Sequence, residues 1–482
     1  MRSSSSSPEA LVQLDRSRPR SLRSQLEAAL RDAVRSGRLT PGTRLPSSRA
    51  LAADLGVTRG VVVDAYDQLR AEGYIATRPG AGTIVGPQAA GQPGRAGAAR
   101  RRESRGTAGR PQPAPAATGP RYDFRPGMPD LGLVPRRAWQ RAWRDGFARL
   151  PDGELGYGDA RGMPALRRAL AAYLGRVRGV IADPEHVVVT NGFSHGLSLV
   201  AEALQHAGID RIAIEDPGQP GLDHVVRGSG AVSVACPVDG EGLDVAALAA
   251  SGARAVLLTP AHQFPTGVVL GAERRSALVS WARSVDGFVI EDDYDAEYRY
   301  DRYPVGAVQG VLPERGIYAG TLSKSLAPGF RLGWLVVPPS LLDAIVARRG
   351  MTDLGTNAPM QAALTLFLER GDLDRHLRRT RRAYAQRRDA LVSAVASLLP
   401  SSSLAGVAAG LHVVLRLPPG THEQALTAAA AERGVTVYPM SDYRRSPTSS
   451  PAPALVLGYG NLRPDALTTA TTHLAAAYHS LP

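Results

Sequence analysis

Hydrophobic residues recur at helical spacing near the start of the chain. Leu22, Leu26, Leu30 and Val34 stand four residues apart within SLRSQLEAALRDAVRSG. Residues at this spacing share one face of an α-helix, and an apolar face predicts a helix packed against a core. Glycine is favoured just beyond a helix C-terminus, so the pattern predicts a first helix that ends near Gly37.

A second helical segment, SSRALAADLG, occupies residues 47–56. Leu51 and Leu55 stand at helical spacing, and the segment opens with two serines. Either Ser47 or Ser48 is a suitable N-cap, because a serine hydroxyl can accept a hydrogen bond from the first turn. The glycine at the end of the segment predicts the stop.

A third helix and a hairpin follow. The third helix is predicted from Thr58 through Glu72, with Val62, Ala65 and Leu69 on one face. The next stretch, YIATRPGAGTIVG, has two β-rich runs around a Pro-Gly-Ala-Gly turn, which is typical of a β-hairpin. Two helices, a four-residue turn, a helix and a hairpin give the order of a winged helix-turn-helix.

Positive side chains surround the predicted turn. In a helix-turn-helix, the second helix enters the major groove with its N-terminal residues nearest the base edges. Here those residues are Thr58, Arg59 and Gly60. Arg44 and Arg49 would flank them as phosphate contacts, and Arg78 lies on the predicted wing. The alternative is a small three-helix bundle whose arginines are ordinary surface charge.

The charge of the chain is uneven, and this favours DNA binding. The net charge is +13, yet residues 1–120 alone carry 19 arginines against 9 acidic residues. Such asymmetry indicates a polyanion-binding part joined to a part with another role. Residues 87–120 are rich in Pro, Gly, Ala and Arg and nearly lack large apolar side chains, so we expect a flexible linker there.

The string LPSSRALAADLGVTRGVVVDAYDQLRAEGYI resembles the GntR family of bacterial repressors, and the resemblance extends over about residues 20–86. It implies operator DNA as a partner. The contact residues that it implies are Arg44, Ser48, Arg49, Thr58, Arg59, Arg78, and the wing-tip glycines Gly80 and Gly82.

From Val187 onward, short β-branched runs alternate with amphipathic segments. This alternation predicts an α/β fold with a mainly parallel sheet and helices on both faces. The predicted strands are VVVT (187–190), RIAI (211–214), AVLLT (255–259), GFVIED (287–292), GIYAG (316–320) and LGWLVV (332–337). The domains we expect are a winged helix-turn-helix at 15–86, a linker at 87–120 and an α/β domain at 121–482.

The composition excludes several classes of protein. Hydrophobic residues make up 44% of the chain, enough for a large core, but no run of 18 apolar residues predicts a membrane span. The serine-rich start lacks the apolar region of a signal peptide. Cys236 is the single cysteine, so no intrachain disulfide is possible. We expect a cytoplasmic protein without a membrane partner or a metal site.

Lys324 is the only lysine among 57 lysine and arginine residues. The two side chains are nearly equivalent as solvated charge, but an amine can lose its proton and act as a nucleophile, whereas a guanidinium stays charged. The commonest such chemistry is a Schiff base with a carbonyl. The alternative is a surface lysine present by chance, so the neighbouring residues must decide.

Ligands of parallel sheets lie beyond the carboxyl ends of the strands, and three such ends supply a consistent set. VVVT is followed by NGFSHG, whose backbone N–H groups can bind a phosphate. GFVIED ends at Asp292, and a carboxylate at this position is costly unless it faces a cation. GIYAG is followed by Thr321, Ser323 and Lys324. A phosphate loop, an aspartate and an amine match pyridoxal 5′-phosphate (PLP), with its phosphate, ring nitrogen and aldehyde.

The order of these pieces resembles the fold-type I aminotransferases over about residues 121–482. With the winged helix and linker, it resembles the MocR/GabR subfamily of GntR regulators, of which TPAHQFPTG, IEDDYDAEY and TLSKSLAPGFRLGW are typical. Members of that subfamily are PLP-bound dimeric transcription factors. The resemblance implies Lys324 as the Schiff-base residue, Asp292 at the ring nitrogen and Tyr294 at O3′. The phosphate contacts that it implies are Phe193, Ser194, Thr321, Ser323, Arg331 and, from the neighbouring subunit, Tyr157.

Three positions depart from the pattern of the family. Gln219 stands where an aromatic side chain usually stacks on the ring, and Phe264 stands where aminotransferases keep an asparagine near O3′. The strand ALVLGYG has Leu455, Val456 and Leu457 where an arginine would bind a substrate carboxylate. The nearest cations in sequence are Arg444, Arg445 and Arg463. A carboxylate buried without a partner is strongly disfavoured, which argues against ordinary amino-acid turnover.

Three functional hypotheses follow. The first is a transcription regulator that responds to PLP or an amino-acid-like effector and controls genes of vitamin B6 synthesis. The second is a catalytic aminotransferase with an unrelated N-terminal part, for which no carboxylate-binding arginine can be placed. The third is a repressor that uses the fold without PLP. We expect the first, with the aminotransferase fold serving as a ligand sensor rather than an enzyme.

Overall fold

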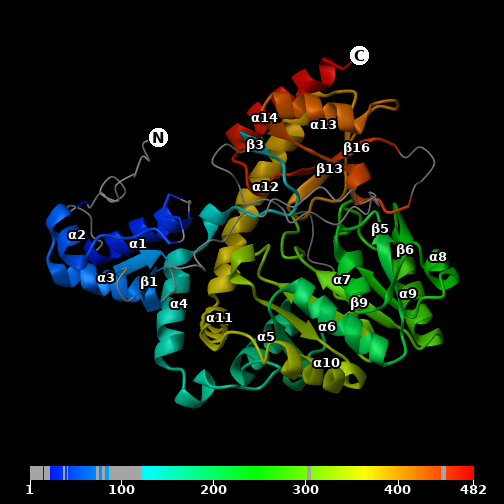
Figure 1. Cartoon of the computed structure of the whole chain (residues 1–482). Coiled ribbons are helices and arrows are strands. Elements are labelled where there is room, and N and C mark those ends of the chain that lie inside the picture. Colours follow the sequence, from blue (N-terminus) through cyan, green and yellow to red (C-terminus); the bar gives the residue numbers. More distant parts are fainter. Residues whose placement is uncertain are drawn as a thin grey trace, which may run out of the picture. The chain divides into compact units, whose positions relative to one another are not determined.

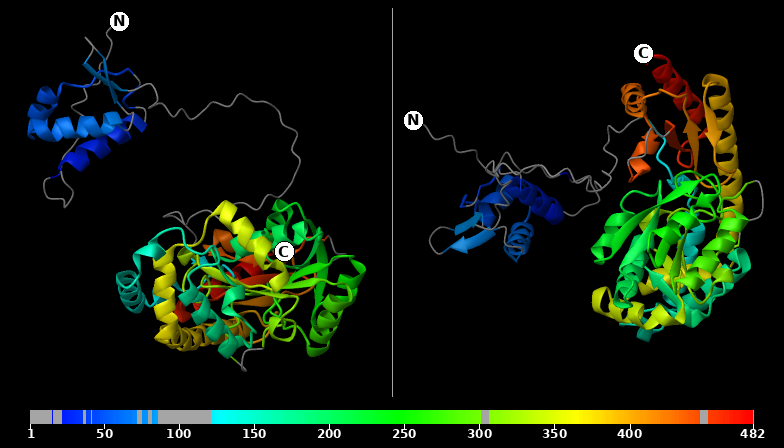
Figure 2. Two further views of the ribbon diagram at one scale, coloured as in Figure 1. Left: turned by 90° about the horizontal axis from the view of Figure 1, so that it is seen from below. Right: turned by 90° about the vertical axis from the view of Figure 1, so that its right-hand side faces the viewer.

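The structure is a computed structural model. It describes residues 15, 22–35, 38–40, 42–71, 75–78, 82–85, 121–300, 306–446 and 452–481. The chain divides into two compact units, Met1–Arg105 and Gly106–Pro482, which Figures 1 and 2 draw in three views. The predicted linker, residues 87–120, lies outside the described residues. None of the described helices is long and apolar enough to cross a membrane.

The smaller unit has the predicted order of elements. These are α1 (Leu22–Arg35), α2 (Ser48–Asp54), α3 (Arg59–Ala71) and the antiparallel strands β1 (Ile75–Arg78) and β2 (Gly82–Val85). Ser47 is the N-cap of α2, and its hydroxyl accepts a hydrogen bond of 3.2 Å from the Ala50 N–H. The cap satisfies one of the free donors of the first turn. Gly37, the predicted stop of the first helix, lies outside the described residues.

The core of this unit is apolar, as the helical spacing predicted. Leu26, Leu30 and Val34 of α1 pack with Leu51 of α2 and Val62 of α3. Within the described part of the unit, every buried side chain is hydrophobic. The chain just before α2 pairs with strand β2 of the hairpin, because the Leu45 N–H donates a hydrogen bond of 2.8 Å to the Thr83 carbonyl.

The larger unit is built on a mixed, mostly parallel sheet. Among its described strands, β11 and β7 run in one direction and the other six run in the opposite direction. The order across the sheet is β4 (Val187–Thr190), β11 (Gly333–Val336), β10 (Gly316–Thr321), β9 (Phe288–Asp293), β8 (Ala255–Leu258), β5 (Arg211–Asp216), β6 (Val232–Asp239) and β7 (Gly242–Leu243). Figure 1 shows the helices on both sides of this sheet.

Alternation along each strand divides the core between the two faces of the sheet. On β5, Ile212 and Ile214 pack on one side with α6 (Phe193–His206), α7 (Leu222–Gly228) and α10 (Pro339–Thr352). Ala213, between them, packs on the other side with α8 (Val245–Ala250) and α9 (Ala272–Ser284). Helices α4 (Arg136–Ala148), α5 (Pro164–Arg178) and α11 (Ala358–Glu369) cover the β4 end of that second face.

A second, antiparallel sheet lies nearer the C-terminus. Its order is β12 (Ser403–Ala405), β13 (His412–Arg416), β16 (Ala454–Gly458) and β15 (Tyr438–Pro439), and a separate parallel pair joins β3 (Tyr122–Asp123) to β14 (Val435–Thr436). The helices α13 (Glu423–Glu432) and α14 (Pro464–His479) pack there, together with the long α12 (Asp372–Leu398). Figure 1 shows α12 running from this region toward the large sheet.

All six predicted strands are present, within a residue or two of their predicted ends. The direction of β11 is the feature that the alternation did not predict. A crossover between parallel strands needs a dozen or more residues, but β10 ends at Thr321 and β11 begins at Gly333. The chain therefore turns straight back, and this short connection contains Lys324.

Candidate functional site

Lys324 lies in the turn that follows β10 and is partly buried. Its amine nitrogen lies 3.1 Å from the position that a Cβ on Gly127 would occupy, so the glycine leaves room for the amine. Burial lowers the pKa of Lys324, and the negative charges of Asp295 and Asp292 oppose this shift. The lowered pKa favours the neutral amine, which is the nucleophilic form.

Asp292 is a buried carboxyl without a hydrogen-bond partner in the described part of the chain. Burial, followed by the nearby charge of Asp293, raises its pKa well above the ordinary value, while Lys324 opposes the shift. A cation beside Asp292 would restore the charged form. The protonated ring nitrogen of PLP is such a cation, so the orphaned carboxyl fits the cofactor that the fold implies.

Asp293, the next residue of β9, points to a different environment. Its carboxylate accepts hydrogen bonds of 2.6 Å from Arg178 Nε and from the Tyr318 hydroxyl. Successive strand residues face opposite sides of a sheet, which explains why one aspartate is paired and the other is not. Both residues lie within β9, which extends one residue beyond the predicted strand 287–292.

The predicted phosphate loop follows β4. Helix α6 begins at Phe193, and its N-cap Gly192 has φ +91° and no side-chain cap. The first-turn N–H groups, including those of Phe193 and Ser194, therefore point toward any anion placed there. Arg331 donates to the Asn191 carbonyl at 2.9 Å, and its guanidinium would touch a Cβ on Gly192 at 3.3 Å. The structure thus brings Arg331 to this loop.

Thr321 and Ser323 lie on the same turn as Lys324. The Thr321 hydroxyl donates to Ser323 Oγ at 3.0 Å and accepts from the Ser323 N–H at 3.2 Å. These bonds fix the turn between the end of β10 and the lysine. A fixed turn is what a reacting amine requires, because small displacements of reacting groups are costly.

Tyr294 is held by residues that the sequence did not single out. Its hydroxyl donates to the His262 carbonyl at 3.0 Å, and His262 Nδ1 lies 3.1 Å from the Asp295 carboxylate. Burial raises the pKa of Tyr294 well above its ordinary value, so the phenol stays protonated. Phe264 packs edge-on against Tyr294, with ring centroids 6.0 Å apart.

His262, Asp295 and His412 form a buried cluster beside Tyr294, with one ligand-type atom of each within 4.8 Å of the others. His262 Nε2 and His412 Nδ1 have no hydrogen-bond partner among the described residues. The sequence predicted no such cluster. His262 lies in the motif HQFPTG and Asp295 in the motif IEDDYDAEY. These two motifs were the only indication of the cluster in the sequence.

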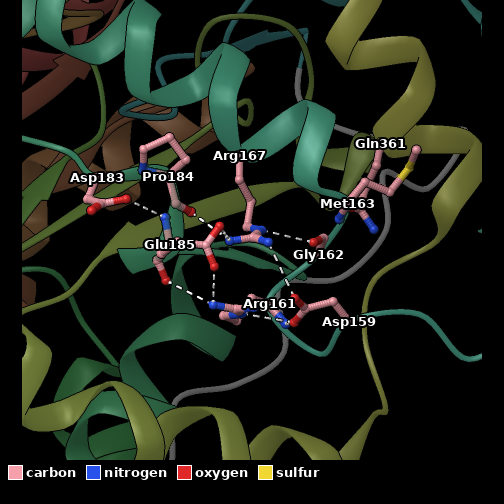
Figure 3. A network of polar contacts seen from close by, with 9 residues as sticks. All are labelled: Asp159, Arg161, Gly162, Met163, Arg167, Asp183, Pro184, Glu185 and Gln361. Atoms are coloured by element: carbon pink, nitrogen blue, oxygen red, sulfur yellow. Dashed lines mark hydrogen bonds and ion pairs between the residues drawn. The ribbon is translucent and has the colours of Figure 1, made fainter.

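Tyr157 is 90% exposed and makes no hydrogen bond to the other candidate residues in the described chain. The segment after it is firmly anchored. Arg161 pairs with Asp159 at 2.6 Å and with Glu185 at 2.7 Å, and the buried Arg167 contacts the same two carboxylates (Figure 3). This network holds the Tyr157 segment against the start of β4 and leaves the tyrosine itself at the surface.

The departures from the family pattern have structural counterparts. Gln219 is exposed, and the three apolar residues of β16 are buried in the second sheet. The side chain of Arg463 is 81% exposed and pairs with Asp465 at 3.6 Å. The Arg445 N–H donates to the Asp216 carboxylate at 2.9 Å. The strand β16 (Ala454–Gly458) itself contains no arginine that could bind a substrate carboxylate.

On the smaller unit, two pairs of predicted DNA contacts lie together. Arg59 Nε donates to the Ser48 hydroxyl at 3.4 Å, which joins the starts of α2 and α3. The Arg44 guanidinium lies 3.6 Å from the Cβ position of Gly82 on the wing. Arg49 and Thr58 are exposed.

The last two predicted DNA contacts lie on the wing. Arg78 ends β1 and pairs with Gly82 across the hairpin. Gly80 falls outside the described residues. The exposed arginines among the described contacts are Arg44 before α2, Arg49 in α2 and Arg59 at the start of α3.

Comparison with known families agrees with this division of the chain. Residues 22–85 match the model of the bacterial regulatory proteins of the gntR family, and residues 128–450 match the aminotransferase class I and II family. The GntR match implies DNA binding, and the second match suggests a small-molecule ligand. The fold is that of enzymes that depend on PLP.

Relatives with both parts are also known. The chain is 35% identical to the "HTH-type pyridoxine biosynthesis transcriptional regulator PdxR" of Corynebacterium glutamicum, over 90% of this chain and 91% of the relative. It is 35% identical to the "probable rhizopine catabolism regulatory protein MocR" of Rhizobium meliloti, over 98% and 96%. An archaeal alanine:glyoxylate aminotransferase structure matches with a TM-score of 0.67 and 26% identity, over 74% of this chain and 90% of that one. The chain therefore belongs to the aminotransferase class I and II family and, with its GntR domain, is a transcription regulator of the MocR type.

Proposed function

We propose that this chain is a dimeric, PLP-binding regulator that binds operator DNA through α3 and the wing. PLP or an amino-acid-like effector changes the affinity for the operator, and the regulated genes are those of vitamin B6 synthesis. The protein acts in the cytoplasm, where its DNA partner is found. The observation that carries the proposal is the unpartnered Asp292 carboxyl near the amine of Lys324.

The residues that would hold PLP come from three strand ends. Lys324 would bind its aldehyde, Asp292 its ring nitrogen and Tyr294 its O3′. The phosphate would be bound by the N–H groups of Phe193 and Ser194, by Thr321, Ser323 and Arg331, and by Tyr157 of a second subunit. When bound, PLP supplies an electron-withdrawing ring and a reactive carbonyl. The protein contributes a buried amine of lowered pKa and a carboxylate that keeps the ring nitrogen protonated.

PLP itself is the favoured effector. An amino acid carries a carboxylate that must be paired when it is buried, and the three β16 residues at the family's clamp position are Leu455, Val456 and Leu457. The relative named as a regulator of pyridoxine biosynthesis shares 35% identity with this chain and supports the same assignment.

A homodimer is supported by large apolar side chains that are exposed on the larger unit. Exposed apolar patches of this kind commonly mark protein interfaces. Phe147, Leu155, Met351 and Leu354 are all more than half exposed. Light scattering on the purified protein tests this part, and a mass of one chain at micromolar concentration would refute it.

Catalytic transamination is the second candidate, favoured by the presence of Lys324, Asp292 and Tyr294 together. It predicts that an amino acid converts the bound cofactor to its amine form, which changes the visible spectrum. In the regulator proposed here, PLP shifts operator affinity at fixed salt, and a panel of amino acids leaves the spectrum unchanged. A flat PLP titration together with an effect of one amino acid would reassign the effector.

A further inference from the structure

A cavity lies in the larger unit, between α5 and α12. Its volume is about 290 Å³, near the lower end of the range for small-molecule sites. Arginines from both helices line it. They are Arg176 and Arg178 from α5, and Arg378 and Arg381 from α12.

The positive charge of this cavity is only partly compensated. Arg178 pairs with Asp293, and the exposed Arg176 pairs at 2.8 Å with Asp374, whose side chain is half-buried. Within the described chain, Arg378 and Arg381 have no carboxylate partner. Arg381 donates two hydrogen bonds, of 2.9 and 2.6 Å, to the backbone carbonyl of Glu297. Two guanidinium charges on one helix therefore lack a counter-ion.

Two further side chains make the cavity suited to an anion. The Tyr173 hydroxyl lines it, is buried, and has no hydrogen-bond partner among the described residues. A buried hydroxyl without a partner is costly, and a ligand acceptor would satisfy it. Burial, followed by the charge of Asp293, raises the pKa of the Glu297 carboxyl to about 8. At neutral pH the Glu297 side chain is therefore mostly uncharged and does not neutralise the arginines.

We propose that this arginine cavity, lined by Tyr173, Arg176, Arg378 and Arg381, binds the phosphate group of a small phosphate monoester. The planar guanidinium matches phosphate oxygens with two parallel hydrogen bonds and is the preferred group for such recognition. Guanidinium groups from two helices line one partly open cavity, and the Tyr173 hydroxyl adds a donor. The volume admits a molecule of a few carbon atoms attached to the phosphate.

The arginine cavity is distinct from the group of residues around Lys324, namely Lys324, Asp292 and Tyr294, which we call the lysine pocket. One ion pair joins the two. Arg178 reaches from the cavity wall to Asp293 at 2.6 Å. Asp293 precedes Tyr294 and follows Asp292, the two residues proposed to contact PLP. The two sites thus lie on opposite sides of the end of β9.

The test is calorimetric titration of the full-length protein, saturated with PLP and then dialysed. The probes are glycerol 3-phosphate, which carries no amine, and inorganic phosphate. We expect glycerol 3-phosphate to bind, and Arg378→Gln with Arg381→Gln to weaken it at least tenfold. The matched control is Arg382→Gln, an exposed arginine on the same helix that does not line the cavity. It should change the affinity less than twofold.

Tyr173→Phe and the single Arg378→Gln provide variants that keep the packing of the unit. Each should weaken glycerol 3-phosphate several-fold. Absence of binding to the wild type, or equal binding by the wild type and the double variant, would overturn the proposal. Inorganic phosphate bound as tightly as glycerol 3-phosphate would overturn the assignment to a phosphate monoester.

Discussion

In the smaller unit, Arg44, Arg49 and Arg59 are exposed and the core beneath them is apolar, whereas in the larger unit Asp292 and Asp295 are buried. Exposed arginines interact with phosphates through a charge that salt screens. Buried carboxylates are screened little, and their cost is relieved only by a specific partner. The exposed charges of the smaller unit therefore suit a salt-dependent partner, whereas the buried charges of the larger unit suit specific ligands.

The same comparison explains why the role of charged residues could be predicted from the sequence more fully for the smaller unit than for the larger one. Charge in the smaller unit could be counted directly, because exposed arginines act nearly independently. Charge in the lysine pocket depends on which neighbour each group faces.

Replacing Lys324 with Ala should have the largest effect. The amine is the group proposed to bond the aldehyde of PLP, and no other lysine exists in the chain. We expect complete loss of the visible absorbance of the PLP-loaded protein. Lys324→Arg is the matched control for charge, since it keeps a cation but cannot make the bond. Absorbance retained in both variants would remove the lysine from the site.

Asp292→Asn should weaken PLP binding without abolishing the chromophore. A hydrogen bond to a charged group contributes about 1.5–3 kcal/mol, so the Kd should rise by roughly tenfold to a hundredfold. Fluorescence quenching on PLP addition measures the change. Asp293→Asn is an informative comparison, because this neighbour pairs with Arg178 instead. If both variants fold normally and weaken PLP binding equally, Asp292 is not the aspartate that contacts the ring nitrogen in preference to Asp293.

Arg59→Gln should weaken operator binding by about 1–2 kcal/mol and reduce the slope of log K against log salt by about 1 if the contact is to phosphate. Arg59 is exposed at the start of α3. The PLP absorbance should stay unchanged, which separates the two units. Anisotropy of labelled operator DNA at several salt concentrations gives both numbers, and an unchanged slope and affinity would exclude Arg59 from the interface.

The stability of the larger unit should fall as pH rises from about 6.5 to 8, above the range in which the lowered pKa values of His376 and His412 have the opposite effect. Burial raises the pKa of Glu215 and Glu291 to about 7 and that of Glu297 to about 8, from an ordinary 4.5. The folded unit therefore holds protons that the unfolded chain has released, and raising the pH favours unfolding. Hydrogen exchange of β8 and β9 peptides measures this, with α1–α3 peptides as the control after correction for the intrinsic rate. Glu215→Gln should reduce the pH dependence.

Ser47→Ala should have the smallest effect, lowering the stability of the smaller unit by about 1 kcal/mol. The Ser47 hydroxyl caps α2 through the Ala50 N–H. Ser48→Ala is the matched control, since Ser48 is the first residue of the helix and not its cap. A larger loss of stability for Ser48→Ala than for Ser47→Ala would contradict the assignment.

Local pattern was sufficient for most elements of the fold. The spacing of Leu26, Leu30 and Val34 predicted α1 and its buried face, and six β-branched runs predicted the strands of the large sheet. The choice between Ser47 and Ser48 as cap and the antiparallel direction of β11 depend on where the chain turns in space. Periodicity does not encode either.

The lysine pocket was predicted only in part for a related reason. Lys324 stood out because it is unique, but Asp292 and Asp293 are chemically identical, and only the pleat of β9 distinguishes the one that pairs with Arg178. His262 and Asp295 are separated by more than thirty residues in sequence, and their contact with Tyr294 arises from packing. Roles that rest on such long-range contacts need the structure.

The most direct test of the central claim is the affinity of the full-length protein for its operator, measured by anisotropy with increasing PLP at fixed salt. Coupling between two sites commonly changes affinity by fivefold to about a hundredfold. We predict a PLP-dependent shift of at least fivefold for the wild type and none for Lys324→Ala. A flat titration for the wild type, or the same shift in both proteins, would contradict the proposal that PLP bound at Lys324 controls DNA binding.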